Sequence, residues 1–306
     1  MERIAIIGAG AVGLYYGARL ALNGEKVSFL LRSDYDTVEA DGIHLESIHG
    51  DAHLTGARIF RSPQEMGPVD LIIVAWKATS NPLFEEVIPP LCHENTQVLT
   101  LQNGLGNCER ISEVVGPDRV LGGLCFVCLN RLSAGHVGHT AGGKVTIGEW
   151  QPQPDSPRAS ELVRRFKAAN IPAELSRDLK EAQWRKLVWN IPFNGLSIAE
   201  GGVTTDKLLA DSGIEAEVRA IMSDVVTAAE AIGHKIDPDV IDFEINRTRS
   251  MAAYRPSSMI DYIEGREVEF DAIWGEPLKQ ALQAGARVPH MESLAARIQK
   301  RIGKLQ

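Results

Sequence analysis

The stretch IAIIGAGAVG, residues 4–13, decides the fold of this 306-residue chain. A short apolar run leads into three glycines spaced G-x-G-x-x-G, and helical spacing of apolar residues follows. Between a buried strand and a helix, this spacing is typical of a turn that binds a dinucleotide pyrophosphate at the helix N-terminus. A glycine-rich turn without a ligand is the alternative. The expected cofactor-binding residues are Gly8, Ala9, Gly10, Ala11, Val12 and Gly13.

The end of the second expected strand, residues 26–31, indicates which dinucleotide is bound. A site that prefers NAD places Asp or Glu there, to bind the ribose 2′-hydroxyl. This sequence has Arg32, whose guanidinium can pair with a 2′-phosphate through two charge-assisted hydrogen bonds. We therefore expect NADP(H) rather than NAD(H). A solvated surface arginine is one alternative, and Asp34 as the ribose-binding acid is another.

Strand-like and helical segments alternate through the first half of the chain. This order favours a Rossmann-type, doubly wound parallel sheet covered by helices on both faces. The expected strands are residues 3–7, 26–31, 71–75, 97–101, 120–129, 144–147 and 173–176, and the expected helices are residues 12–23, 82–91 and 157–169.

Strand-like alternation nearly vanishes after about Asp178. We expect an α/β fold in which residues 1–177 form the NADP-binding domain and residues 178–306 form an all-helical domain for the substrate and catalysis. The expected helices of the second domain are residues 181–199, 214–232, 239–251, 270–284 and 291–302.

The composition of the chain limits the kinds of partner that we expect. The net charge is -8 and no run of Lys or Arg stands out, so nucleic acid is not expected. No stretch of about 18 apolar residues could span a membrane. Glu2 and Arg3 lead straight into the apolar run and the glycines, unlike a signal peptide. We therefore expect a cytoplasmic protein.

The cysteines and histidines do not indicate a metal site. Four cysteines are too few and too irregular for a disulfide framework. Cys125 and Cys128 form a lone C-x-x-C without a second ligand pair, so we expect buried thiols. His136 and His139 stand in a glycine-rich turn without a nearby carboxylate and are expected to be loop residues.

One predicted helix of the second half carries a polar stripe. Lys186, Asn190 and Asn194 are spaced i, i+4 and i+8, which places them on one face among apolar neighbours. A lysine and two amides are costly to bury without partners, and Pro192 is expected to kink the helix. The stripe would suit the floor of a cleft, although a solvated polar face has the same spacing.

Four further residues are candidates by their position. Lys77 and Asn103 follow apolar strands, and ligands of doubly wound sheets bind beyond the carboxyl ends of strands. Ser258 lies in RPSSM, where a hydroxyl pair after a proline could hold a carboxylate, and Glu269 could pair with a lysine. A surface lysine, a turn asparagine and ordinary loop or helix residues are the alternatives.

Taken together, these residues resemble the ketopantoate reductase (2-dehydropantoate 2-reductase) family. The resemblance runs over essentially the whole chain, and the order and spacing of its short motifs make it specific. The matching pieces are IAIIGAGAVG at 4–13, Arg32, Lys77, LQNGLGN at 101–107, WRKLVWNIPFNGLS at 184–197, SSM at 257–259 and EFD at 269–271.

The resemblance implies reduction of 2-dehydropantoate to pantoate with NADPH, on the route to pantothenate. It implies that Lys186 is the general acid that protonates the carbonyl oxygen, and that Glu269 orients this lysine or contacts the cofactor. The remaining implied roles are substrate binding by Asn190, Asn194 and Ser258, a bridge between cofactor and substrate by Asn103, and a cofactor contact by Lys77. No metal is implied, and a homodimer is left open.

Two departures from the family pattern keep other functions open. Arg255 stands three residues before Ser258, and Thr204 stands about ten residues after Asn194, where some members have asparagine. A reductase of another branched 2-oxo acid or an opine-like substrate is therefore the second hypothesis. A dinucleotide-binding sensor without turnover is the third, and the intact set of polar residues disfavours it.

Overall fold

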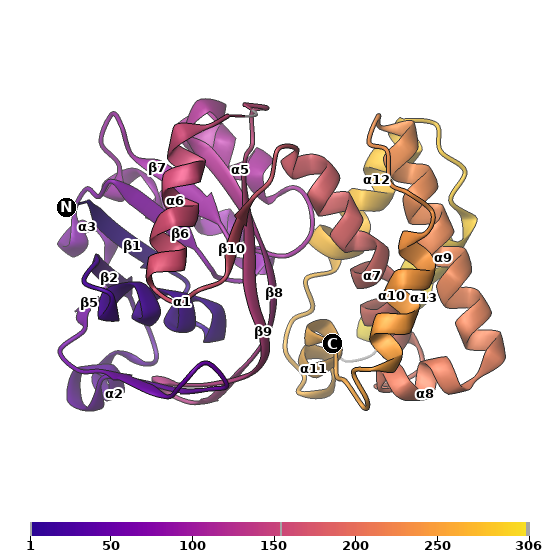
Figure 1. Ribbon diagram of the computed structural model, residues 1–306, viewed down its shortest axis with the longest axis horizontal. Coiled ribbons are helices and arrows are strands. Elements are labelled where there is room, and N and C mark those ends of the chain that lie inside the picture. Colours follow the sequence, from indigo (N-terminus) through magenta and orange to yellow (C-terminus); the bar gives the residue numbers. More distant parts are fainter. Residues whose placement is uncertain (1, 154, 304–306) are drawn as a thin grey trace. The chain divides into compact units, whose positions relative to one another are not determined.

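The computed structural model describes residues 2–153 and 155–303, which divide into two compact units (Figure 1). The first unit spans Met1–Asn103 and Asn107–Leu179, and the second spans Gly104–Gly106 and Lys180–Gln306. Each unit has its own cluster of buried apolar side chains. The described residues of the second unit contain helices and no strand, so the expected α/β class with a helical second half is confirmed.

Ten strands of the described residues form one sheet in the first unit. Six of them run parallel in the order β5-β2-β1-β6-β7-β8, and the strand order reverses between β1 and β6, as in doubly wound folds. The strands are β1 (Arg3–Ile7), β2 (Lys26–Leu30), β3 (Ile43–Ser47), β4 (Ala52–Leu54), β5 (Arg58–Phe60), β6 (Leu71–Val74), β7 (Gln97–Thr100), β8 (Val120–Ser133), β9 (His136–Glu149) and β10 (Ala173–Leu175).

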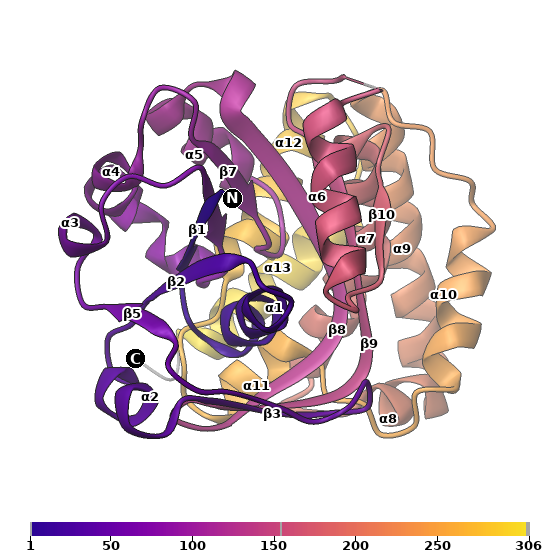
Figure 2. The same cartoon turned by 60° about the vertical axis from the view of Figure 1, so that its left-hand side comes forward.

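The β8–β9 hairpin departs from the parallel pattern and is longer than the sequence indicated. Its two antiparallel strands have 14 residues each, and the other edge of β9 pairs in parallel with β3 and with β10. The sheet thereby curls around α1 (Ala11–Leu22), which contacts β1, β2, β3, β4, β8 and β9 (Figure 2).

The expectation that His136 and His139 are loop residues is wrong. Both lie on β9, where the backbone is paired with β8 on one side and with β3 on the other. The glycines of this stretch favour a turn, but pairing on both edges satisfies its backbone and holds it extended. The side chain of Leu132 packs 3.3 Å from where a Cβ of Gly138 would lie.

The remaining helices of the first unit are short, apart from α6. The expected single helix at residues 82–91 is wrong: α4 is flanked by two 3₁₀ segments, because Pro82, Pro89 and Pro90 cannot donate backbone hydrogen bonds. The sequence did not indicate α2, α5 or strands β3 to β5. The elements are α2 (Tyr35–Asp41), α3 (Pro63–Met66), η1 (Ala78–Leu83), α4 (Phe84–Val87), η2 (Pro89–Leu91), α5 (Asn107–Val115), η3 (Pro117–Arg119) and α6 (Pro157–Ala168).

The second unit is built around α7 (Leu179–Ala199), whose residues 187–199 are all buried. A helix that is buried on every side belongs to the core, and α7 therefore organises this unit. Near the end of the chain, Arg301 Nε donates a hydrogen bond to the Ala199 carbonyl at the last residue of α7, at 3.0 Å. The other elements are α8 (Thr205–Ala210), α9 (Ser212–Ala231), α10 (Val240–Arg249), α11 (Ser257–Ile263), the π-turn η4 (Asp271–Gly275), α12 (Glu276–Gln283) and α13 (Pro289–Ile302).

Candidate active site

Four predicted site segments of the first unit follow neighbouring strands of the parallel sheet. In the order β2-β1-β6-β7, the carboxyl ends of parallel strands point to one edge, at and beside the reversal of strand order. This edge is where doubly wound sheets bind their ligands. The residues that follow these four strands are Arg32, Gly8 to Gly13, Lys77 and Asn103.

The glycine turn has the geometry that a pyrophosphate needs. Gly8 has φ +90°, and a Cβ there would lie 2.1 Å from the Trp76 backbone nitrogen, so the loops after β1 and β6 touch. A Cβ on Gly13 would lie 2.3 Å from the Gly8 carbonyl oxygen, which fixes α1 tightly on the turn. At Gly10 a Cβ would meet nothing within 4 Å.

The start of α1 is therefore open to an anion. Among the described residues, no side chain caps the N-terminus of α1 at Gly10, and the first turn of this helix carries no acidic residue. The helix N-terminus has unsatisfied N–H groups and a partial positive charge. A nicotinamide dinucleotide fits these residues, because Gly10 has no side chain and its pyrophosphate can therefore approach the backbone at this position.

Arg32 is exposed, and the nearby carboxylate of Asp34 is not. Asp34 is 5% exposed and accepts hydrogen bonds from Ser33 Oγ at 2.8 Å and from the Gly135 N–H at 3.1 Å. The Arg131 guanidinium also donates to it. Asp34 is thus engaged within the protein and is not presented to a ribose hydroxyl, which leaves Arg32 as the charged group of this loop that faces solvent.

A chain of side-chain amides holds the loop that carries Asn103. Gln102 Nε2 donates to Asn81 Oδ1 at 2.7 Å, Asn81 Nδ2 donates to Asn107 Oδ1 at 2.8 Å, and Asn107 Nδ2 donates to the Asn103 carbonyl at 2.9 Å. The chain connects the loop after β6 with the loop after β7. Sequence reasoning missed these positioning residues, although Gln102 and Asn107 lie within the LQNGLGN motif.

In the second unit, α7 carries the polar stripe as predicted. Lys186 is half-buried, whereas Asn190 and Asn194 are 8% and 2% exposed. Asn194 Nδ2 donates to the Asn190 carbonyl at 3.1 Å. Trp274 Nε1 donates to the Ile191 carbonyl at 3.0 Å, which fastens the π-turn to the same helix.

Asn194 joins the stripe to Ser258. The Ser258 N–H, in the first turn of α11, donates to Asn194 Oδ1 at 3.1 Å, and Ser258 is 2% exposed. Within the described residues, no hydrogen bond engages the Ser258 hydroxyl or the Asn190 amide. Asn194 therefore positions Ser258, while Ser258 and Asn190 keep polar groups available at the buried end of the stripe.

Glu269 is buried and lies two residues before the turn of π-helix. Within this turn the Glu276 N–H bonds to the Asp271 carbonyl, and Pro277 has no N–H to offer. The Ala272 carbonyl, left without a helical donor, accepts the Leu105 N–H at 2.8 Å. The π-turn thus anchors the short loop Gly104–Gly106, which lies between Asn103 and Asn107.

The two positions that depart from the family pattern lie at the surface or close to it. Arg255 is exposed, and Thr204 is half-buried with its hydroxyl donating to Asp206. Hydrogen bonding to Thr204 lowers the pKa of the exposed Asp206 carboxyl. Only Arg255 of these two residues is charged, and it is an exposed residue three positions before Ser258 in the sequence.

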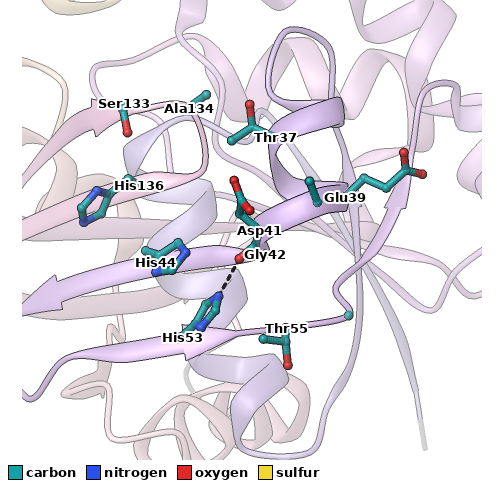
Figure 3. A pocket seen from close by; sticks show the side chains of 12 residues that line it. Thr37, Glu39, Asp41, Gly42, His44, His53, Thr55, Ser133, Ala134 and His136 are labelled. Atoms are coloured by element: carbon teal, nitrogen blue, oxygen red, sulfur yellow. Dashed lines mark hydrogen bonds between the residues drawn. The ribbon is translucent and has the colours of Figure 1, made fainter.

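A cavity of about 470 Å³ in the first unit contains none of the predicted site residues (Figure 3). It lies over β3, β4 and the tip of the β8–β9 hairpin. His53, His44 and His136 stand in register on three adjacent strands, with the first two rings stacked at 3.8 Å. The described residues contain no group of three or more His, Cys, Asp or Glu placed to hold a metal ion.

Cys125 and Cys128 differ from their expected burial. Neither residue forms a disulfide, and both are half-buried rather than fully buried. Among the described residues, no helix is long and apolar enough to cross a membrane.

Comparison with known proteins places both halves of the chain in one family. The model "Ketopantoate reductase PanE/ApbA" matches residues 4–152, and its "C terminal" counterpart matches residues 178–301. The chain is 38% identical to a 2-dehydropantoate 2-reductase of Nostoc sp. over 96% of this chain and 93% of that protein.

Solved structures agree along the whole chain. A 2-dehydropantoate 2-reductase of Geobacter metallireducens superposes with a TM-score of 0.95 at 42% identity, covering 97% of this chain and 99% of that one. One of Methylococcus capsulatus gives 0.92 at 30% identity, covering 99% and 98%.

Proposed function

Because the chain belongs to the ketopantoate reductase family, we propose that it reduces 2-dehydropantoate to pantoate with NADPH. It is then an NADP-dependent oxidoreductase acting on a CH–OH group, in pantothenate biosynthesis. In this proposal residues 1–177 bind the cofactor, and residues 178–306 supply the substrate-binding and catalytic side chains.

The observation that carries the proposal is the hydrogen bond from the Ser258 backbone N–H to Asn194, which lies on the same helix as Lys186. It sets a hydroxyl and an amide at the buried end of a stripe that begins with a lysine. A 2-oxo acid has a carboxylate next to a ketone. Its reductase therefore needs neutral hydrogen-bond donors that bind the carboxylate and an acid that protonates the ketone oxygen. This set of side chains offers both.

In the proposed mechanism, Ser258 donates its hydroxyl proton in a hydrogen bond to the substrate carboxylate, and Asn190 and Asn194 orient the substrate's polar groups. The glycine turn and Arg32 would hold the nicotinamide cofactor, whose chemistry would be to provide the hydride for the ketone carbon. Lys186 Nζ stabilises the negative charge that builds on the ketone oxygen and transfers its proton to it, and solvent restores that proton. Glu269 orients the lysine or contacts the cofactor.

Cofactor selection rests on Arg32 in this proposal. Its exposed guanidinium follows β2, and Asp34 is withdrawn into the protein. Replacement of Arg32 by Ala is expected to weaken NADPH binding much more than NADH binding. Fluorescence titration with both cofactors measures the two dissociation constants, and equal losses would refute a role at the 2′-phosphate. Lys77 and Asn103 complete the proposed cofactor contacts.

A second candidate reaction is favoured by Arg255 and Thr204. A guanidinium close to Ser258 in the sequence would suit a substrate with a second acidic group, or another branched 2-oxo acid. The test is steady-state NADPH oxidation by the purified protein with 2-dehydropantoate and a panel of other 2-oxo acids. Selective turnover of 2-dehydropantoate supports the proposal, and selective turnover of another member keeps the chemistry while changing the substrate.

The same assay tests the third hypothesis, a dinucleotide sensor. Binding of NADPH without oxidation by any 2-oxo acid would establish it. We further propose a cytoplasmic location, supported by the four cysteines of the described residues, none of which forms a disulfide, as suits a reducing compartment. A homodimer is the proposed assembly to be tested by sedimentation.

A further inference from the structure

The tip of the β8–β9 hairpin binds the carboxylate that is nearest in sequence to Arg32, the residue proposed to bind the 2′-phosphate. Asp34 lies two residues after Arg32, and its side chain is 6% exposed while that of Arg131 is 45% exposed. Arg131 is 97 positions away in the sequence, near the end of β8. It forms an ion pair with Asp34, and the Gly135 N–H donates to the other carboxylate oxygen at 3.1 Å.

The hairpin tip is held firmly enough to perform this role. Gly135 has φ +67°, and a Cβ there would lie 3.1 Å from both the Gly42 carbonyl and the Val38 side chain. Its own carbonyl accepts the His44 N–H at 2.9 Å. Figure 3 shows this tip, at Ser133 and Ala134, beside α2. The donors to Asp34 therefore come from a fixed element and not from a free loop.

Charge makes this contact relevant to cofactor choice. A 2′-phosphate carries nearly two negative charges, and a carboxylate within a few ångströms would repel it or pair with the arginine meant for it. NADH has a neutral hydroxyl at this position, with which a free carboxylate can form a hydrogen bond. A free Asp34 carboxylate would therefore weaken the binding of NADPH and favour the binding of NADH.

We propose that Arg131 is a specificity-determining positioning residue: it holds Asp34 away from the cofactor, so that the loop after β2 accepts a 2′-phosphate. This inference rests on the proposed preference for NADP(H). In this proposal Arg131 does not contact the cofactor itself and acts only through Asp34.

The test compares five variants: Arg32→Ala, Arg131→Ala, Asp34→Asn, the double variant of Arg131 and Asp34, and Arg164→Ala. The last removes an exposed arginine paired with Glu161 on α6 and controls for the loss of one positive charge. Dissociation constants for NADPH and NADH are measured by fluorescence titration. Adenosine 2′,5′-bisphosphate and 5′-AMP, measured by calorimetry, isolate the contribution of the phosphate. Thermal unfolding reports on folding.

Arg131→Ala is expected to weaken NADPH and the bisphosphate about tenfold while NADH and 5′-AMP change little, since only the former pair carries the 2′-phosphate. Asp34→Asn and Arg164→Ala should keep the wild-type preference, and Asp34→Asn should restore it in the double variant. A structural role alone would weaken all four ligands together and would not be rescued by removing the carboxylate.

Two outcomes overturn the inference and remain distinguishable. If Arg32→Ala is selective for NADPH but Arg131→Ala is not, or the double variant is as impaired as Arg131→Ala, the positioning role is wrong and the proposed cofactor stands. If neither arginine variant is selective, the preference for NADP(H) itself fails, and the inference fails with it.

Discussion

The two units contribute to the proposed reaction through different parts of the chain. In the first unit the proposed cofactor contacts are mainly backbone: the N–H groups at the start of α1 and glycines that let other atoms come close. In the second unit the proposed chemistry belongs to side chains on α7, one of which, Asn194, accepts a hydrogen bond from the Ser258 backbone 64 residues away. A backbone site is therefore sensitive to added bulk, and a side-chain site to the loss of single functional groups.

The largest expected effect belongs to the side-chain site. Lys186→Ala should lower kcat by about 10²- to 10⁴-fold, the usual contribution of a positioned acid or base. NADPH binding should be almost unchanged, because the backbone turn that binds it is intact. Steady-state kinetics and fluorescence titration separate the two effects. A parallel loss of cofactor affinity would show that Lys186 belongs to the binding of both ligands.

Ser258→Ala is expected to raise KM for the 2-oxo acid by about tenfold, as for the loss of one hydrogen bond to a charged group. The effect on kcat should be smaller, because the proton donor is untouched. Ser257→Ala is the matched control, since Ser257 is exposed and adjacent in the sequence. Equal effects of the two substitutions would contradict the assignment of the carboxylate to Ser258.

A pair of glycine substitutions separates binding from packing in the backbone site. Gly10→Ala places a methyl group in open space at φ −80°, so stability should hold while NADPH affinity falls several-fold. Gly13→Ala forces a methyl group to within 2.3 Å of the Gly8 carbonyl, and should cost about 1–3 kcal/mol of stability. Thermal unfolding without cofactor should give a lower melting temperature for Gly13→Ala than for Gly10→Ala. A lower melting temperature for Gly10→Ala would contradict the proposed roles.

The smallest effect concerns His139, which lies within the curl of the sheet. Burial lowers the pKa of its imidazole, and the neutral ring bonds to Ser47 Oγ at 2.8 Å and to the Ala141 carbonyl at 3.1 Å. A depressed histidine pKa means that the unfolded chain binds the proton first. This contribution to stability is therefore present above the ordinary histidine pKa and is lost as the pH falls through the folded value.

His139→Gln should flatten the fall of the melting temperature between neutral and mildly acidic pH, because glutamine does not titrate. His234, which lies in the second unit, serves as the control when it is replaced in the same way. An unchanged pH profile in His139→Gln would assign the acid sensitivity to other groups.

The same contrast explains what the sequence could predict. The turn at residues 8–13 and Arg32 were accessible, because a backbone site imposes fixed spacings within one strand–turn–helix unit. The stripe on α7 was accessible as a helical repeat. Its partner Ser258 is 64 residues from Asn194, and only the family resemblance connected the two.

Other features depended on pairing between distant segments. The amide chain through Asn81 and Asn107 spans 26 residues, and the Asp34–Arg131 contact spans 97, so no local pattern contains them. The histidines of β9 were misassigned because glycines nearby favour turns, whereas β3 and β8 hold the strand from both sides. Local preference fails where long-range hydrogen bonding decides the conformation.

The most direct test of the account is a single-turnover experiment on the unaltered protein. NADPH is bound at a concentration below that of the protein, and 2-dehydropantoate is then added while the absorbance of the reduced cofactor is followed. The account predicts rapid, complete oxidation of the bound NADPH, and no oxidation when pantoate replaces the oxo acid. Bound NADPH that stays reduced in the presence of 2-dehydropantoate would contradict the proposal that the two units serve one reduction of this substrate.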